Sequence, residues 1–419
     1  MDLKALMQKL ETIDKNTILT EAEKKETTWT DKSGKKHPAT QVKGDKYTGK
    51  EAEKDEKSDK KAKKESVEPE FKSKFMKSVF SLFVLLLVFS TTAQENINYR
   101  VPSQEILALA DFERAPSVSM DTKKEFMLLS YRNTYKTLDD LNQEEIRLGG
   151  LRINPITNIS STMSYINNLK IRKISNKTEV QVSGLPKNPK IANISWSPNE
   201  QKIAFTNTTN TGVELWFINV VSAEAKKITE DNLNANLGSP YNWMIDNETL
   251  LVKVLPKNRP ALIDVKKDLP KGPTVMLSDG SKSQNRTYPD LLKNKVDEDN
   301  FDALVTSELY KVSLSGALEL FKTQAIYTGE SYSPDGNYLL LTTIKKPYSY
   351  IVPLSRFPQT TTVYDNLGKE IKVVNEVPLT EIMPKGFSSV RKGKRNMSWR
   401  SDKPATLSYV IALDEGDQA

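Results

Sequence analysis

The chain of 419 residues has no cysteine and a single histidine, His37. The lack of thiols excludes a cysteine nucleophile, a disulfide framework and any zinc site with cysteine ligands. A Ser-His-Asp catalytic group would have to use His37, and a metal site made of several histidines is excluded. There is also no glycine-rich phosphate loop, so nucleotide binding has no support, and we expect no cofactor.

Large apolar side chains are nearly absent from residues 1–71 after Leu19. Residues 1–70 contain 17 lysines and 16 acidic residues. Because the two signs are balanced and arginine is missing, the composition predicts a solvated, disordered tail and no nucleic-acid partner. His37 lies in the polar stretch GKKHPAT, where we expect a surface loop.

Residues 72–93 have the composition of a secretory signal peptide. Basic residues precede an apolar run of eleven residues at 79–89, and small residues lead to an expected cleavage between Ala93 and Gln94. The run is short for a membrane span, which needs about 20 residues. A buried strand or a weak internal anchor is the alternative. Because a signal peptide stands at the start of a chain, we expect residues 1–75 to be a foreign extension and Met76 to be the native start. The protein would then contact the membrane only transiently, through the signal segment, and would be periplasmic or secreted.

Residues 94–419 have short β-branched and aromatic runs separated by turn residues, which predicts an all-β body. A hairpin with a Ser-Pro-Asp-Gly type of turn recurs, most clearly in ISWSPNEQKIAFTN (194–207) and ESYSPDGNYLLLTT (330–343). The five turn residues are Asp121, Asn199, Asp246, Asp335 and Asp402, with gaps of 78, 47, 89 and 67 residues. A propeller blade takes about 40–50 residues, so the spacing predicts a β-propeller with insertions. The longer gaps leave one or two blades open, and a β-sandwich is the alternative.

Two helices are expected outside the strands, at residues 103–112 and at 288–304, with Pro289 in the first turn of the second. The acidic triplet Asp297, Glu298 and Asp299 lacks the spacing of a calcium loop, so a solvated run beside the helix is favoured.

The tryptophans of the β body are expected in the core between blades, with stacking platforms for a ligand as the alternative. They are Trp196, Trp216, Trp243 and Trp399.

Three long runs carry a family resemblance: EEIRLGGLRINPITN (144–158), SPDGNYLLLTTIKKPYSYIVPLSRFPQTTTVYDNLG (333–368) and SSVRKGKRNMSWRSDKPATLSYVIALDEGD (388–417). From residue 97 onward the chain resembles the propeller portion of the glutamyl endopeptidase-like branch of the prolyl oligopeptidase (S9) serine peptidases, especially exported bacterial members. The resemblance implies an α/β-hydrolase domain after the propeller, which carries the catalytic serine, aspartate and histidine.

The sequence departs from this pattern because it contains no G-x-S-x-G nucleophile elbow. The nearest approach, Gly329-Glu330-Ser331-Tyr332-Ser333, has serine in place of the closing glycine. No catalytic residue of the family can therefore be placed here. We expect an incomplete propeller, 94–419, that is inactive alone and meets its peptide substrate in the intact enzyme through the absent hydrolase domain.

These observations give a leading function and an alternative. The leading hypothesis is the substrate-gating, non-catalytic portion of an exported peptidase that hydrolyses peptides, with cleavage after glutamate as the specificity. The alternative is a stand-alone periplasmic propeller that serves as a protein-binding scaffold. In the basic cluster at 391–395, Arg391 and Arg395 are candidate contacts for an acidic substrate side chain, with ordinary surface charge as the competing interpretation.

Overall fold

The computed structural model describes residues 102–110, 112, 114–264, 287–384 and 388–416, together with the backbone of two short strands near the N-terminus. The chain divides into two compact units, Met1–Tyr99 and Arg100–Ala419. In the first unit, β1 (Thr28–Thr30) pairs antiparallel with β2 (Lys36–Pro38). His37 therefore lies on a strand opposite Trp29, and its expected loop placement is wrong. The rest of the tail, the segment 72–93 and the Ala93–Gln94 bond lie outside the described residues.

The second unit is mostly β, as the sequence predicts. Its described residues form two four-stranded sheets, a seven-stranded sheet, a small three-stranded sheet and a two-stranded sheet. The seven-stranded sheet divides at one long strand into two four-stranded meanders, which are counted below as the third and fourth sheets. The first sheet contains β3 (Ser117–Met120), β4 (Phe126–Tyr131), β8 (Asn168–Lys173) and β9 (Thr178–Gln181). The second sheet contains β10 (Ile191–Trp196), β11 (Lys202–Thr208), β12 (Val213–Asn219) and β13 (Glu224–Lys227). The fifth sheet contains β21 (Arg395–Trp399) and β22 (Leu407–Val410).

The third and fourth sheets share one long strand, β17 (Leu318–Tyr332). Its residues 318–325 pair with β16, and its residues 326–332 pair with β18. The third sheet also contains β14 (Tyr241–Trp243), β15 (Thr249–Val254) and β16 (Ser307–Ser313). The fourth sheet continues with β18 (Tyr338–Ile344), β19 (Gln359–Asp365) and β20 (Glu370–Val377). Each of these sheets has the strand order of a propeller blade.

Insertions inside the sheets account for the two longest gaps between the predicted turns. Residues 132–167, between β4 and β8, carry α4 (Leu138–Leu141) and a small sheet of β5 (Ile146–Leu148), β6 (Leu151–Asn154) and β7 (Ile159–Ser160). Residues 255–306, between β15 and β16, carry α5 (Lys295–Val305). Within the described residues each gap therefore holds one four-stranded sheet, which favours one blade over the two that the spacing left open.

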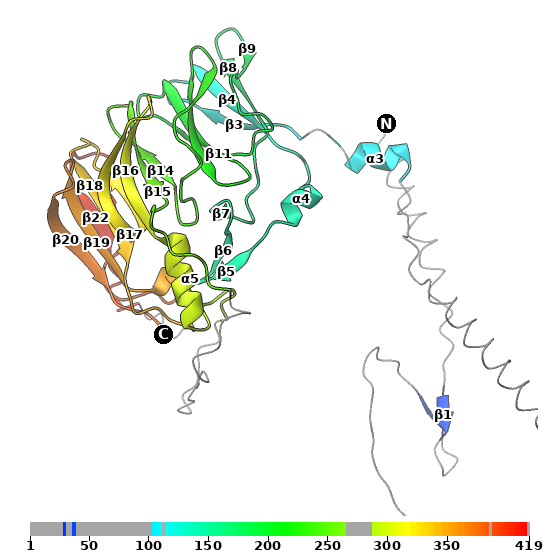
Figure 1. The fold of residues 1–419 in the computed structure, drawn as a ribbon, viewed down its shortest axis with the longest axis vertical. Coiled ribbons are helices and arrows are strands. Elements are labelled where there is room, and N and C mark those ends of the chain that lie inside the picture. Colours follow the sequence, from blue (N-terminus) through cyan, green and yellow to red (C-terminus); the bar gives the residue numbers. More distant parts are fainter. Residues whose placement is uncertain are drawn as a thin grey trace, which may run out of the picture. The chain divides into compact units, whose positions relative to one another are not determined.

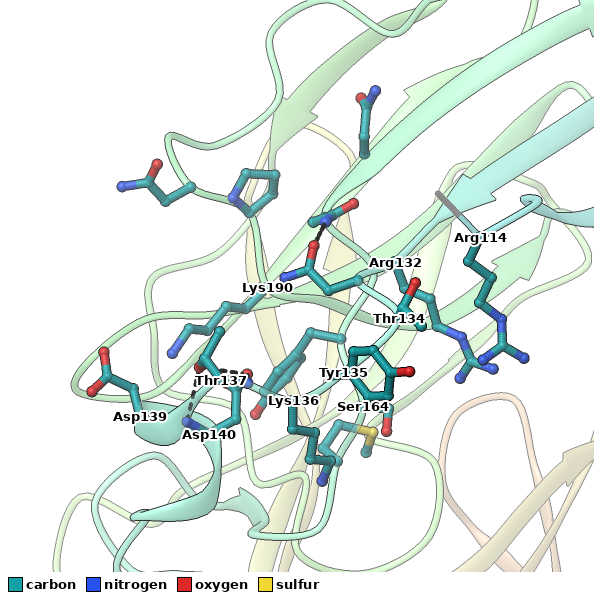
Figure 2. Close-up of a pocket in the computed structure, with 17 residues that line it drawn as sticks. Arg114, Arg132, Thr134, Tyr135, Lys136, Thr137, Asp139, Asp140, Ser164 and Lys190 are labelled. Atoms are coloured by element: carbon teal, nitrogen blue, oxygen red, sulfur yellow. Dashed lines mark hydrogen bonds between the residues drawn. The ribbon is translucent and has the colours of Figure 1, made fainter. Parts of the chain in front are cut away.

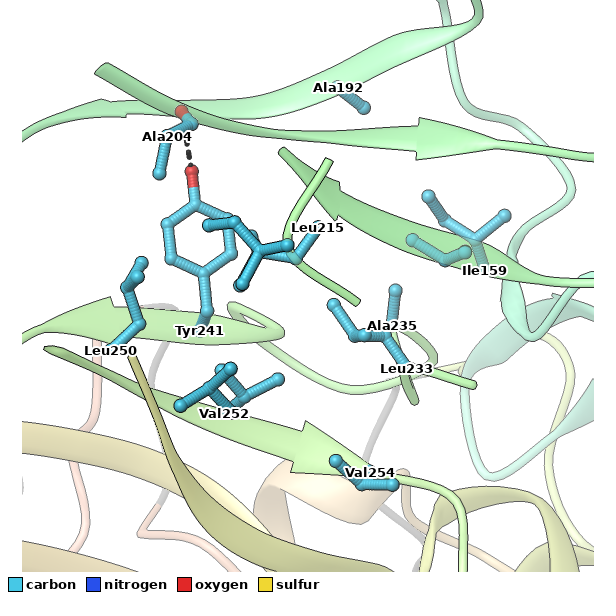
Figure 3. Close-up of a cluster of buried hydrophobic side chains, with 13 residues drawn as sticks. Ile159, Ala192, Ala204, Leu215, Leu233, Ala235, Tyr241, Leu250, Val252 and Val254 are labelled. Atoms are coloured by element: carbon cyan, nitrogen blue, oxygen red, sulfur yellow. Dashed lines mark hydrogen bonds between the residues drawn. The ribbon is translucent and has the colours of Figure 1, made fainter. Parts of the chain in front are cut away.

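Neighbouring sheets pack face to face through apolar side chains. Leu128 and Ile171 of the first sheet meet Phe205 of the second. Leu215 of the second sheet joins Leu250 and Val252 of the third in the cluster of Figure 3. Burial of one such side chain contributes about 1.5–3 kcal/mol, so these interfaces hold successive sheets together. Figure 1 shows the sheets following one another in chain order, from cyan and green to orange.

The helices agree only partly with the sequence prediction. The helix expected at 103–112 is α3 (Gln104–Ala110), but the one expected at 288–304 begins seven residues later, at Lys295. Asn294 caps α5 by accepting a hydrogen bond from the backbone NH of Asp297. Asp290 has a left-handed backbone (φ 60°) and accepts a hydrogen bond from Arg152, so Pro289 stands in a turn bound to the small sheet. One further 3₁₀ turn is η1 (Leu354–Arg356), and no helix among the described residues is long and apolar enough to cross a membrane.

Candidate functional site: a basic pocket at the ends of the strands

A pocket of about 840 Å³ opens where β4 ends and β10 begins. Its walls are the segment after β4 with α4, the segment before β8, the segment before β10, and Arg114 before β3. β4 runs from the turn at Asp121 to Tyr131, so the pocket lies at the opposite end of the strands from the predicted turns. We call it the rim pocket (Figure 2).

The loop after β4 is held in place by a capping box at the start of α4. Thr137 Oγ1 accepts a hydrogen bond from the backbone NH of Asp140 at 3.1 Å, and Asp140 Oδ2 accepts one from the Thr137 NH at 3.0 Å. Burial opposes ionisation of Asp140, but the hydrogen bonds from Thr137 and the charges of Lys190 and Lys136 outweigh it and lower the pKa of this carboxyl. Asp140 is therefore an ionised, structural residue of the pocket wall.

Two of the four cations in the pocket have protein partners. Lys136 Nζ donates to the backbone oxygen of Thr162 at 2.9 Å. Lys190 Nζ lies 5.9 Å from the centre of the Tyr165 ring, and burial raises the pKa of that phenol. Arg114 and Arg132 make no ion pair with any residue that the structure describes, and Arg132 Nε is buried without a hydrogen-bond partner there.

Sequence reasoning missed Arg114 and Arg132. The available signal was positional: Arg132 directly follows β4, and Arg114 lies three residues before β3, the other strand of the same hairpin. Loop residues at strand ends are where scaffolds of rigid strands commonly carry binding groups. The two arginines are 18 positions apart, so they form no cluster in the sequence.

The candidate substrate contacts Arg391 and Arg395 are near each other, and Arg391 lines a pocket of about 780 Å³ whose walls do not include Arg395. Its guanidinium donates to the backbone oxygens of Lys392, at 2.8 Å, and of Lys394. Burial and the charge of Arg395 lower the pKa of Arg391. This guanidinium is thus engaged by its own loop, and the pocket also presents carboxylates, those of Glu381, Asp414 and Glu415.

Other singled-out residues have structural positions. Asp297 lies in the first turn of α5, where its carboxylate accepts a hydrogen bond from the Lys293 NH at 2.9 Å. The described residues contain no group of three or more side chains suited to a metal ion. Gly329-Glu330-Ser331-Tyr332-Ser333 lies on β17 and the first residue beyond it, so it forms no strand-to-helix elbow.

The four tryptophans expected in the core are half-buried, and three of them donate hydrogen bonds to the preceding sheet, whereas Trp216 donates to Glu214 of its own strand. Trp196 Nε1 donates to Ser119 Oγ of the preceding sheet at 2.9 Å, and Trp243 Nε1 donates to the Ser195 oxygen at 3.3 Å. Trp399 Nε1 donates to the Ser331 oxygen at 2.9 Å. The tryptophan at the end of β10, β14 and β21 therefore joins its sheet to the preceding one.

The fold defines a protein built from consecutive four-stranded antiparallel meanders, with a pocket lined by four cations at the ends of its strands. The chain is 36% identical over 335 residues to "Probable glutamyl endopeptidase, chloroplastic" of Oryza sativa subsp. japonica, a match that covers 77% of this chain and 35% of the relative. It is 34% identical over 334 residues to the protein of the same name from Arabidopsis thaliana, covering 76% and 34%. The chain thus spans about a third of the length of these relatives.

No family model matches the chain. Among solved structures, it resembles an acylaminoacyl peptidase from Pyrococcus horikoshii with 13% identity and a TM-score of 0.36, over 64% of this chain and 33% of that one. It also resembles a putative TolB from Agrobacterium tumefaciens with 8% identity and a TM-score of 0.31, over 72% and 91%. Neither similarity is close enough to assign the fold.

Proposed function

We propose that the chain is the β-propeller portion of a serine peptidase of the prolyl oligopeptidase family, in its glutamyl endopeptidase-like branch. The observation that carries the proposal is the 36% identity to a protein named glutamyl endopeptidase, over 77% of this chain. The four meander sheets and their face-to-face packing support it, because they have the architecture of propeller blades. In this role the propeller restricts access to a hydrolase domain, and peptides are cleaved after glutamate.

The proposal assigns no chemistry to the chain itself. The 419 residues contain no G-x-S-x-G sequence, and the nearest approach to one lies on β17. We expect the purified chain to show no hydrolysis of a fluorogenic glutamyl peptide above a buffer blank. Hydrolysis that is blocked by a serine-directed inhibitor would contradict this assignment.

The coding sequence beyond the codon for Ala419 tests the proposal most directly. We expect an open frame that encodes a hydrolase domain with a G-x-S-x-G elbow. A product spanning both parts should cleave short glutamyl peptides and spare folded proteins, because a propeller over the active site admits only narrow substrates. A frame without such a domain would refute the peptidase assignment and favour the protein-binding scaffold.

We propose further that residues 72–93 direct export, with cleavage between Ala93 and Gln94. The support is compositional: three lysines, an apolar run and a small-residue end. The two relatives are named chloroplastic, so import into an organelle is the competing outcome. Mass spectrometry of the product from its native cells should find a new N-terminus at Gln94, and a retained segment would refute the proposal.

A further inference from the structure

The backbone brings Arg114 and Arg132 to one place. β3 and β4 pair antiparallel with Ser117 opposite Ser130, and the same register continued by two residues sets position 115 opposite Arg132. Beyond that point Thr134 Oγ1 donates to the Phe112 oxygen at 2.8 Å, so the two segments stay together past the last ladder pair. The segments that carry Arg114 and Arg132 are therefore held together between the Ser117–Ser130 pair and the Thr134–Phe112 hydrogen bond.

The acidic side chains of the rim pocket and its two arginines lie on different sides of it. Figure 2 shows Asp139 and Asp140 on one side of the rim pocket and the guanidinium ends of Arg114 and Arg132 together on the other. The Asp140 carboxylate is occupied by Thr137, and Lys136 is tied to the Thr162 oxygen. The two positive charges on one wall repel each other, and an anion bound between them would offset this repulsion.

Arg132 adds a second observation that points to a missing partner. Its Nε is buried and has no hydrogen-bond acceptor among the residues that the structure describes. Buried donors of folded proteins are paired with few exceptions, and an exception calls for an explanation such as a ligand. The guanidinium Nε and Nη groups form a planar fork that matches the two oxygens of a carboxylate.

We propose that the rim pocket binds the carboxylate of a peptide, held between Arg114 and Arg132. This inference rests on the proposed function, which supplies a peptide as the ligand. The pocket of about 840 Å³ has room for a few residues, within the roughly 300–1,000 Å³ of small-molecule sites. Tyr135 and Ser164 also line it and bring hydroxyl groups for the peptide backbone. The carboxylate comes from an acidic side chain or from the peptide's C-terminus.

Calorimetric titration of the whole 419-residue chain at low salt separates these two sources. The probes are Ac-Ala-Ala-Glu-Ala-NH₂, with only a side-chain carboxylate, Ac-Ala-Ala-Gln-Ala-OH, with only a terminal one, and Ac-Ala-Ala-Gln-Ala-NH₂, with neither. We expect at least one carboxylate peptide to bind ten or more times more tightly than the neutral peptide, and the tighter of the two identifies the source. Equal binding of all three peptides, or no binding, overturns the proposal. Binding of inorganic phosphate alone also overturns it, because the pocket would then be an anion site without peptide recognition.

Matched variants locate the binding. Arg132→Gln and Arg114→Gln should each reduce affinity for the carboxylate peptide tenfold or more, toward that of the neutral peptide. Arg172→Gln removes the same charge from a half-buried position of β8 in the same sheet, where Arg172 pairs with Glu179, and it should change affinity less than twofold. Arg132→Lys keeps the charge without the fork and should recover only part of the loss. Thermal unfolding of each variant checks that it is folded.

Equal losses in Arg132→Gln and Arg172→Gln would show a general charge effect and refute the assigned site. Because Arg132→Lys keeps the positive charge and most of the stem, it tests the pocket even if the glutamine variants do not fold. Failure of the peptidase assignment is a separate result. A missing hydrolase frame refutes the proposed function without changing these affinities, and an unchanged affinity in the arginine variants refutes the pocket while the hydrolase frame stands.

Discussion

At the scale of single residues, Tyr241 links the second and third sheets. Its hydroxyl donates to backbone oxygens of the second sheet, with Ala204 at 2.8 Å and Asn193 also in reach, and Ser195 Oγ donates to it at 3.1 Å. Figure 3 shows the ring among the apolar side chains between the sheets. Burial raises the pKa of this phenol far above its usual range, so Tyr241 stays neutral and keeps its donor.

A pair of Tyr→Phe substitutions tests this link. Tyr241→Phe should lower the free energy of unfolding by about 1–3 kcal/mol, because buried polar groups of the second sheet lose their partner. Tyr332→Phe is the control: the Tyr332 hydroxyl is buried with no hydrogen-bond partner among the described residues, so its removal should be neutral or stabilising. Urea unfolding measures both, and equal losses in the two variants would contradict the assigned link.

Lys253 and Glu330 form a buried ion pair between the third and fourth sheets. Their side chains are each 3% exposed, and Lys253 Nζ lies 2.8 Å from Glu330 Oε1. Lys253 Nζ also donates to the Leu237 oxygen at 3.0 Å. A buried charge whose partner is removed cannot be solvated, so each member of the pair depends on the other.

We expect Lys253→Met and Glu330→Met each to cost about 3–5 kcal/mol of stability, and the double variant to cost clearly less than their sum. The exposed pair of Arg400 and Asp402, at 2.6 Å, is the control, and Arg400→Met should cost no more than about 1 kcal/mol. A double-mutant cycle by urea unfolding measures the coupling. Additive losses would show that the pair is not coupled.

At the scale of elements, the hairpin turns form a second set of contacts between sheets. The carboxylate of Glu200, in the second sheet's turn, accepts hydrogen bonds from Thr122 in the first sheet's turn. The Asn199 NH donates to Asn247 Oδ1 of the third turn at 2.7 Å. The hairpin turns therefore reverse the chain and also join neighbouring sheets, through hydrogen bonds made by residues within the turns.

Gly336 tests the close approach of these turns. It has a left-handed backbone (φ +72°), and an added Cβ would lie 2.4 Å from Ile245 Cγ2. Gly336→Ala should therefore cost at least about 1–2 kcal/mol for the backbone alone, and more for the overlap. Gly329→Ala is the control, since the nearest atom to its added Cβ is 3.9 Å away. Thermal unfolding compares them, and an equal effect would show that the turn can shift freely.

At the scale of the whole described unit, the four meander sheets pack against one another in chain order. The clusters join the first sheet to the second, the second to the third and the third to the fourth. A further cluster joins the small sheet β5–β7 to α5 and the fourth sheet. A chain of such nearest-neighbour interfaces resembles a repeat protein, in which a local loss of packing acts mostly on adjacent repeats.

Leu250→Ala should therefore have a local effect. Leu250 is fully buried between the second and third sheets, so the substitution should cost about 2–5 kcal/mol. Amide hydrogen exchange should accelerate most in these two sheets and least in β21 and β22. Val221→Ala is the control, because Val221 is 78% exposed and its loss should change stability by less than about 0.5 kcal/mol. Uniform acceleration across all sheets would indicate one cooperative unit.

Much of the β architecture followed from local patterns. The turns at Asp121, Asn199, Asp246 and Asp335 could be predicted because side-chain oxygens that bind backbone NH groups act within a few residues. Asp402 instead binds Arg400. The start of α5 was misplaced because Asp290 is held by Arg152, 138 residues away, and no local pattern records that contact.

The sequence by itself determined the mostly β composition, the hairpin turns, the aromatic residues at the strand ends and the lack of a nucleophile elbow. Each of these depends on residue type and on neighbours a few positions away. Only the tertiary structure decided that the described part of each long gap holds one sheet with an insertion, that Lys253 meets Glu330, and that Arg114 and Arg132 line one pocket. These features arise from strand register and from the packing of sheets, which join residues that are distant along the chain.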